Sequence, residues 1–258
     1  RACRQHRVKP ILGVEAYYVD DAAHACAQQL NDRYHLILLA KNQRGVRSII
    51  NLMSESTANY ALDNRVSVVD SDLLARHSDG VIATCACVFG RIPDALWRGD
   101  TATAERTLAR YREIYGDDFY LEVATHYFPE QDIANRHILE LGKREGVRVL
   151  AVNDCHFAQQ AEWYLQRTIM KTLYGELTGY TIESQECYLK SRAEMEHLGF
   201  PAATYDETVK LAERIDDDCA DAMAAPAGMG GTVIAAAGKL QVMDVAEVVK
   251  AAGLVLHL

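Results

Sequence analysis

Short apolar runs alternate with segments of helical periodicity from Lys9 onward, and this alternation constrains the fold more than any other feature of the chain. Five runs rich in Val, Ile, Leu or Tyr predict buried strands, at Ile11–Val19, His35–Ala40, Val81–Cys85, Phe119–Val123 and Val147–Val152. Strands that alternate with helices are typical of parallel sheets with crossover helices. We therefore expect an α/β fold built on a parallel sheet.

Helices are predicted where apolar residues recur on one face of a 3.6-residue period. The predicted helices cover 43–60, a stripe around 108–114, a segment that begins at Pro129, the range Ala161–Tyr174, and a segment from Thr204, where Thr204 and Glu207 have the spacing of a capping box. Five strands with intervening helices predict most of a (β/α) barrel. An open doubly wound sheet is the alternative, because periodicity does not separate the two.

Charge and cysteine usage narrow the class of protein. The formal net charge is -9, whereas a module that mainly grips duplex DNA should carry an excess of Lys and Arg. The seven cysteines are odd in number and form no C-x-x-C pair, which favours reduced thiols and a cytoplasmic protein. No signal peptide opens the chain, and no apolar run approaches the ~18 residues of a membrane helix, so we expect no membrane partner.

The two ends of the chain differ in character from its middle. Arg1 begins what looks like the end of an amphipathic helix, so we expect the N-terminus to be a cut. The chain becomes rich in Ala, Gly and Val after about Asp221. We therefore expect a main domain over 1–218, followed by a linker or divergent Ala/Gly-rich tail over 219–258.

Side chains that can bind metal accompany every predicted strand. Glu15 lies in the first strand, His35 begins the second, Cys87 follows the third, His126 follows the fourth, and Asp154 and His156 follow the fifth. Taken singly, a Glu or His in a strand is more often paired structurally, and a Cys is more often a small buried hydrophobe. Asp154-x-His156 is the strongest pair, because alternate residues of an extended segment point the same way. Mixed carboxylate, imidazole and thiol ligands favour Zn or Mn over Mg.

Several motifs occur in an order that resembles the PHP domain of the bacterial DNA polymerase III alpha subunit. They are Lys9-Pro10-Ile11-Leu12-Gly13-Val14-Glu15, Tyr34-His35-Leu36, Cys87 with Gly90-Arg91-Ile92-Pro93, Gly116-Asp117-Asp118-Phe119-Tyr120-Leu121-Glu122, Pro129-Glu130-Gln131, Ala151-Val152-Asn153-Asp154-Cys155-His156, and Cys187-Tyr188-Leu189-Lys190-Ser191 with Glu194-Met195. The resemblance covers about residues 1–218. It implies a distorted (β/α) barrel of the PHP type that is incomplete at the N-terminus.

The same resemblance implies a ligand set. Glu15, His35, Cys87, Asp154 and His156 take the positions of metal ligands in a site that holds up to three divalent ions, Zn or Mn; His126 is not among the family's ligands and remains a weaker candidate. The family's first strands, with His-x-His, an Asp and another His, would precede Arg1. Thr84-Cys85-Ala86 replaces the family's usual Ser-Gly before the cysteine.

In functional terms, the resemblance implies part of a DNA-directed DNA polymerase, a nucleotidyltransferase of DNA replication. The PHP domain would act as a metal-dependent 3′–5′ exonuclease or support the polymerase structurally. Mg would serve a polymerase domain whose aspartates are absent from this chain, and the expected partners are DNA, the sliding clamp and a proofreading exonuclease. Without the ligands expected before Arg1, we predict that this chain alone is inactive, and no individual residue is assigned a catalytic role. The alternatives are a non-catalytic scaffold and a free-standing PHP phosphoesterase, such as a histidinol-phosphate phosphatase.

Overall fold

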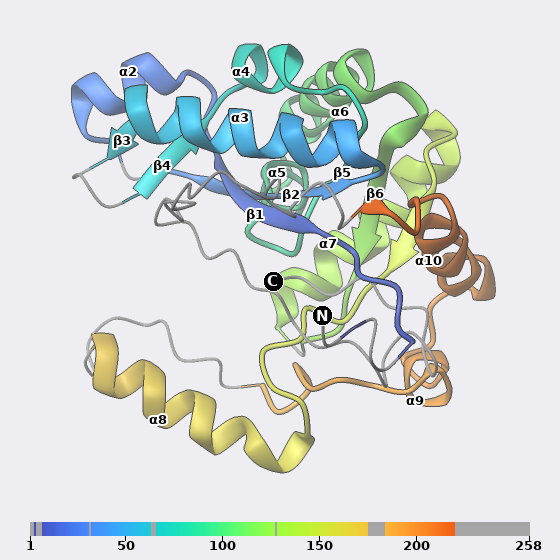
Figure 1. Ribbon diagram of the computed structural model, residues 1–258. Helices are drawn as coiled ribbons and strands as arrows, with labels where there is room; N and C mark the ends of the chain where they lie inside the picture. Colours follow the sequence, from blue (N-terminus) through green and yellow to red (C-terminus); the bar gives the residue numbers. More distant parts are fainter. Residues whose placement is uncertain are drawn as a thin grey trace.

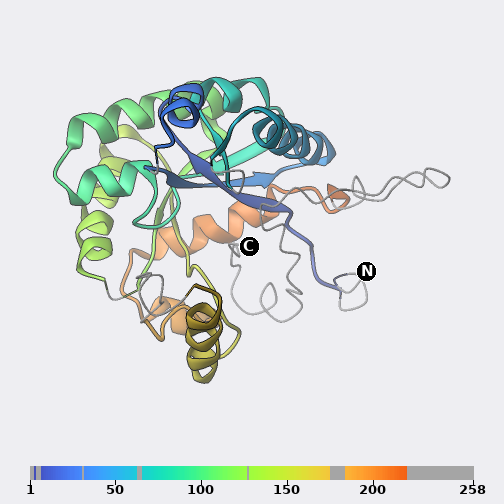
Figure 2. The same cartoon turned by 90° about the vertical axis from the view of Figure 1, so that its left-hand side faces the viewer.

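The computed structural model describes residues 3, 7–30, 32–62, 66–126, 128–174 and 184–219. Its sheet has the strand order β3-β4-β1-β2-β5-β6-β7 and is surrounded by helices (Figure 1, Figure 2). The strands are β1 (Gly13–Tyr18), β2 (Tyr34–Ala40), β3 (Ala61–Leu62), β4 (Val66–Val69), β5 (Val81–Thr84), β6 (Phe119–Val123) and β7 (Val149–Ala151). The helices are α2 (Ala22–Gln28), α3 (Gln43–Asn59), α4 (Ser71–Arg76), α5 (Arg91–Trp97), α6 (Thr101–Tyr115), α7 (Pro129–Glu145), α8 (Trp163–Tyr174), α9 (Arg192–Glu196) and α10 (Ala202–Glu213), with 3-10 turns at Gly116–Asp118 and Gln160–Glu162.

Strand directions show a mixed sheet, so the α/β class is confirmed but the expectation of a wholly parallel sheet is wrong. β1 is parallel to β4, and β5, β6 and β7 are parallel to one another. β2 runs antiparallel to both of its neighbours, β1 and β5. The run Tyr34–Ala40 did not reveal this, because a strand buried on both faces has the same apolar pattern in either direction. Closure of the sheet into a barrel remains a prediction.

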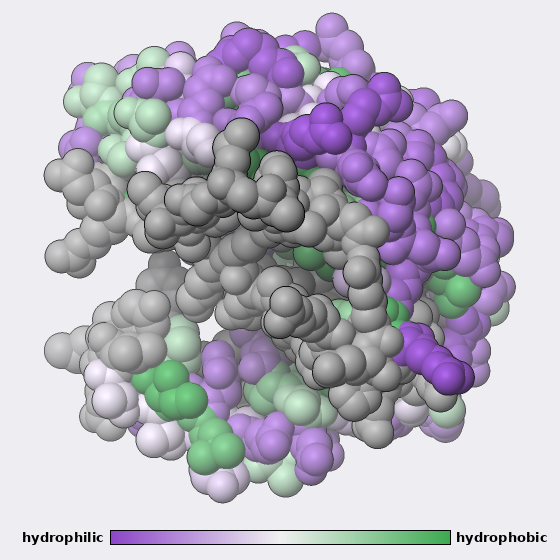
Figure 3. Space-filling view, viewed as in Figure 1, coloured by the Kyte–Doolittle hydropathy of each residue, from purple (hydrophilic) through white to green (hydrophobic). Residues whose placement is uncertain are grey.

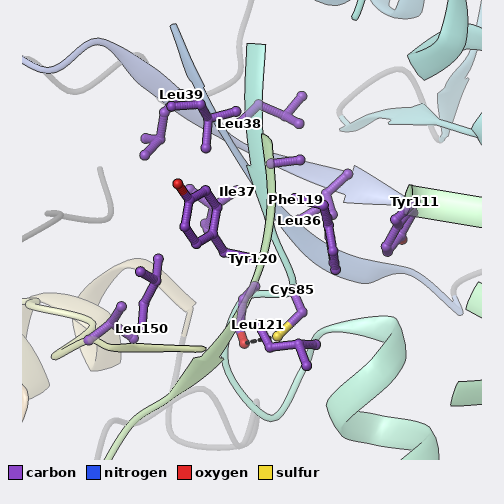
Figure 4. Close-up of a cluster of buried hydrophobic side chains, with 14 of the residues drawn as sticks. Leu36, Ile37, Leu38, Leu39, Cys85, Tyr111, Phe119, Tyr120, Leu121 and Leu150 are labelled. Atoms are coloured by element: carbon purple, nitrogen blue, oxygen red, sulfur yellow. Dashed lines mark hydrogen bonds between the residues drawn. The ribbon is translucent and has the colours of Figure 1, made fainter. Parts of the chain in front are cut away.

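The core lies on both faces of β2, β5 and β6. Figure 4 shows the consecutive residues Leu36, Ile37, Leu38 and Leu39 of β2, which alternate between the two faces of the sheet and are at most 3% exposed. Tyr111 of α6 packs against one of these faces, where its ring centroid lies 5.2 Å from that of Phe119. α3 lies along β1, β2, β4 and β5, while α10 packs against β7 (Figure 1). The strands that carry the site are therefore held in place by packing on both faces of the sheet.

The long helices follow the apolar stripes of the sequence, but one predicted start is wrong. α7 begins at Pro129, as expected. α10 begins at Ala202, two residues before the predicted capping box. Thr204 lies inside the first turn, where its hydroxyl donates to the carbonyl of Pro201 over 2.7 Å instead of capping the helix. Ser191 and Glu194 form a capping box at the start of α9 instead.

α8 stands apart from the sheet at the lower left of Figure 1. It leaves Leu165 and Ile169 about half exposed, and hydrophobic surface is visible over this helix in Figure 3. Within the described ranges, no helix has the length and apolar character needed to cross a membrane. The predicted tail over 219–258 lies outside the described residues, apart from Cys219.

Candidate functional site

The reversed strand brings His35 to the same end of the sheet as the other predicted site residues. β1, β5, β6 and β7 all end at this edge, and β2 begins there because it runs antiparallel to them. The backbone N–H of His35 donates to the carbonyl of Phe89 over 2.9 Å, and His35 forms a bridge with Gly90. A histidine at the start of one strand therefore lies beside residues that follow the ends of others.

Glu15 and His35 form a pair across β1 and β2. The register places Glu15 opposite Ile37 and Tyr17 opposite His35, so the pair are diagonal neighbours on one face. Nδ1 of His35 lies 2.6 Å from Oε1 of Glu15, and their side chains are 27% and 34% exposed. The two atoms form a close ion-pair contact, but its angles are not those of a hydrogen bond.

Asp154 lies between two imidazoles just beyond β7. Its Oδ2 is 3.6 Å from Nε2 of His126, and its Oδ1 is 3.9 Å from Nδ1 of His156. Nδ1 of His156 is also 2.7 Å from the backbone carbonyl of Asp154, so donation there leaves Nε2 available to a metal ion. Asp154 has a φ of 47°, which is left-handed. Asp154 and His156 therefore come together through a left-handed residue, and the prediction of an extended segment is wrong.

Cys87 sits in a tight loop after β5. Ala86 before it has a φ of 60°, and a Cβ on Gly90 would lie 1.9 Å from the carbonyl oxygen of Cys85, so this loop needs glycine at 90. Cys87 is buried, and burial raises the pKa of its thiol well above the usual range, with further contributions from the charges of Asp154 and Glu15. The thiol therefore lies among carboxylates, where a cation would favour the thiolate.

Two buried residues at this edge were not assigned to the site from the sequence. Glu122 of β6 is 1% exposed, and its charge contributes to the raised pKa of Cys87 after burial, Asp154 and Glu15. The register from β1 to β6 places Glu122 on the same face as Glu15. His126, a weaker candidate in the sequence, is 3% exposed and contacts Asp154. In the sequence, the feature that could have identified Glu122 is an acidic residue inside the otherwise apolar strand Phe119–Val123.

The donor chemistry fits a divalent ion more clearly than the geometry does. Carboxylates, imidazoles and a buried thiol are the donors that Zn uses, and the imidazoles and carboxylates also suit Mn. In the part of the chain that the structure describes, however, no three His, Cys, Asp or Glu side chains converge well enough to hold an ion. The residues form two clusters instead, one of Glu15 with His35 and one of Asp154 with His126 and His156.

Comparisons with known proteins agree with the order of these motifs. The PHP domain family matches residues 1–126. The DNA polymerase III subunit alpha of Borreliella burgdorferi is 32% identical over 219 residues, which are 81% of this chain and 19% of that protein. The subunit of Aquifex aeolicus is 32% identical over 178 residues, 66% of this chain and 15% of that protein. The subunit of Treponema pallidum is 30% identical over 226 residues, 85% of this chain and 19% of that protein.

The chain thus spans about a fifth of the length of the relatives it matches most extensively. The similarity extends beyond the matched domain into the segments that contain Asp154 and Lys190, since it covers more than four fifths of the chain. Residues 1–126 therefore match the PHP domain family, in a chain that is similar over most of its length to part of the bacterial DNA polymerase III alpha subunit.

Proposed function

We propose that this chain belongs to a replicative DNA polymerase and that its sheet edge holds divalent ions for hydrolysis of phosphodiester bonds at DNA 3′ ends. One observation carries the proposal. Nδ1 of His35 contacts Oε1 of Glu15 at 2.6 Å, and Nδ1 of His156 is hydrogen-bonded to the backbone carbonyl of Asp154 over 2.7 Å. Metal-binding histidines are usually oriented in this way, with Nε2 facing the ion. The similarity to DNA polymerase III alpha subunits supports the replicative context.

The proposed ligands are Glu15, His35, Cys87, Asp154 and His156, completed by donors beyond the described residues. His126 would orient Asp154 through the contact between Nε2 and Oδ2. Bound Zn or Mn ions would lower the pKa of a water molecule and stabilise charge on the scissile phosphate. Burial of Cys87 and His126 keeps this edge of the sheet partly shielded from solvent, which strengthens the attraction between these ligands and a cation.

Nucleotide release from primed DNA tests this proposal. The full-length protein is incubated with Mn²⁺ and 3′-labelled primed DNA, as wild type and as Asp154→Asn. We expect the substitution to lower the rate at least ~100-fold, since it removes a carboxylate from the ion cluster. Asp206→Asn is the matched control, because Asp206 is an exposed carboxylate on α10 that pairs with Arg192. Equal rates for Asp154→Asn and wild type would refute the hydrolytic role.

A non-catalytic scaffold is the second candidate, favoured by the absence of three converging donors among the described residues. In that case the domain would brace the polymerase, and DNA, the sliding clamp and the proofreading exonuclease would be partners of the whole subunit. Mg would then serve only the polymerase domain. Metal analysis of the purified subunit separates the two, because a scaffold with a degenerate site retains no stoichiometric Zn or Mn.

A further inference from the structure

A pocket of about 480 Å³ opens beside His35, between the start of β2 and the segment 89–100. Its walls include Arg33, Tyr34, Phe89, Arg91 and Arg98. A volume of this size is within the range of small-ligand sites and accommodates one nucleotide. None of these five residues is in the proposed ligand set, so the pocket is a second candidate binding region at the same end of the sheet.

Phe89 presents an aromatic surface at the rim of this pocket. It is 59% exposed, an unusual position for a large apolar side chain. Its ring centroid lies 5.6 Å from that of His35, and the ring of Tyr17 contacts His35 from 5.5 Å. Phe89 therefore connects the pocket directly to a proposed ligand. An exposed aromatic ring in such a place offers a face on which a nucleobase can stack.

Two of the three arginines have their charge engaged by the protein. Nη2 of Arg91 lies 2.7 Å from Asp20, and its guanidinium stacks over the ring of Tyr34 at 4.6 Å. Nε of Arg98 lies 2.8 Å from Oδ1 of Asp94. These arginines shape the walls and supply little net charge to a ligand.

Arg33 differs from them. Its guanidinium lies 5.1 Å from the centroid of the Tyr17 ring, and no carboxylate pairs with it in the described part of the chain. A cation held on an aromatic ring keeps its N–H groups available to a phosphate. The walls also contain three carboxylates, Asp32, Asp94 and Asp100. Asp94 pairs with Arg98, and Asp100 is the N-cap of α6, where it accepts from the N–H of Thr103 over 3.0 Å.

We propose that this pocket binds one nucleotide of a single-stranded nucleic acid, with its base stacked on Phe89 and its phosphate paired with Arg33. The choice of ligand rests on the proposed function, because the strand held here would run past His35. Stacking supplies most of the binding and only one phosphate is paired, so the interaction depends weakly on salt. This agrees with a chain whose net charge is -9.

The test uses the 258-residue chain and a fluorescein-labelled dodecathymidylate, followed by fluorescence anisotropy in EDTA. We expect Phe89→Ala to weaken binding about 10-fold and Phe89→Trp to retain it, since stacking on one aromatic ring contributes roughly 5- to 150-fold. The emission of Phe89→Trp should also be quenched on binding. Arg33→Gln should weaken binding and make the slope of log K against log salt shallower by about 0.7.

Matched controls come from α3, away from the pocket. Ile50→Ala removes another exposed apolar side chain, and Arg47→Gln removes an exposed arginine, and neither should change binding. Circular dichroism establishes that each variant is folded. No binding by wild type, or binding by Phe89→Ala and Arg33→Gln equal to wild type, would overturn the proposal.

Failure of the pocket and failure of hydrolysis are distinguishable. Binding is measured without metal, whereas nucleotide release is measured with Mn²⁺. Weakened binding by Phe89→Ala, together with unchanged nucleotide release by Asp154→Asn, would uphold the pocket and reject the exonuclease. Normal binding by Phe89→Ala, together with loss of release in Asp154→Asn, would reject the pocket alone.

Discussion

Nζ of Lys190 donates a hydrogen bond to Oδ1 of Asn153 over 3.2 Å, and this bond joins the segment before α9 to the residue that precedes Asp154. Lys190 is 3% exposed and Asn153 is 1% exposed. Nζ also lies 3.1 Å from Glu186 and 4.1 Å from the ring centroid of Tyr188. The contact therefore holds the backbone immediately before Asp154.

Replacement of Lys190 by Met should destabilise the chain by about 2–3 kcal/mol, because Asn153 and Glu186 lose a charged partner in a buried setting. Urea unfolding measures the change. Lys210→Met is the matched control: its side chain is 61% exposed and pairs with Glu207, so this substitution should cost much less stability than Lys190→Met. An equal loss of unfolding free energy in the two variants would show that the buried hydrogen bond contributes no more than an exposed ion pair.

Ala86→Gly should leave the free energy of unfolding within about 0.5 kcal/mol of wild type. The left-handed φ of 60° costs an alanine about 1–2 kcal/mol, and its relief offsets the lost burial of a methyl group and the greater freedom of glycine in the unfolded chain. Ala109→Gly, on the exposed side of α6, makes the same change at a helical φ and should cost about 1 kcal/mol. A cost for Ala86→Gly as large as that of Ala109→Gly contradicts this conformation.

Alkaline pH should destabilise the chain partly through Cys219. Burial raises the pKa of this thiol to about 11, with smaller contributions from Asp216 and Asp218, against about 8.5 in an unfolded chain. Between these values the unfolded state binds fewer protons than the folded state, so stability falls as pH rises from about 8.5 to 11. Cys219→Ser can keep the bond that Sγ makes to the carbonyl of Ala40 but does not titrate in this range.

Urea midpoints at pH 7.5 and pH 10 check this sign. Wild type should lose more stability than Cys219→Ser between the two pH values. An identical loss in both proteins would show that the folded environment of Cys219 does not raise its pKa.

The sequence predicted the five strands that carry the site, β1, β2, β5, β6 and β7, because each contains a dense apolar run, but it missed the short strands β3 and β4. It predicted α3 and α7 for a related reason, since each has several turns over which an apolar stripe repeats. It missed α2, α4, α5 and α9, which have between five and seven residues. Two turns of helix carry too few apolar positions to establish a period.

The direction of β2 could not be predicted. A strand that is buried on both faces has a continuous apolar run, and this run is the same whether its neighbours are parallel or antiparallel. The position of His35 follows from that direction. In a parallel strand, a histidine near the start would lie at the opposite edge from Asp154. Only the antiparallel register brings Glu15 and His35 together.

For the site, the Asp154 and His156 pair was recognisable from spacing, although the reason given for it was wrong. Glu122 and His126 required tertiary information, because a single acidic residue or histidine near a strand is usually solvent-facing or structurally paired. Their burial at 1% and 3% results from packing across the sheet end, which local sequence does not encode.

Metal content tests the central claim most directly. The full-length protein is prepared as wild type, His156→Gln and His197→Gln. Each is incubated with Zn²⁺ or Mn²⁺, dialysed and analysed by inductively coupled plasma mass spectrometry. His197 is the matched control, since its Nδ1 lies 2.6 Å from the carbonyl of Ala193 in an exposed turn. We predict that wild type and His197→Gln retain about one ion or more per chain and that His156→Gln retains less. Absence of metal from wild type, or equal retention by His156→Gln, would contradict the account.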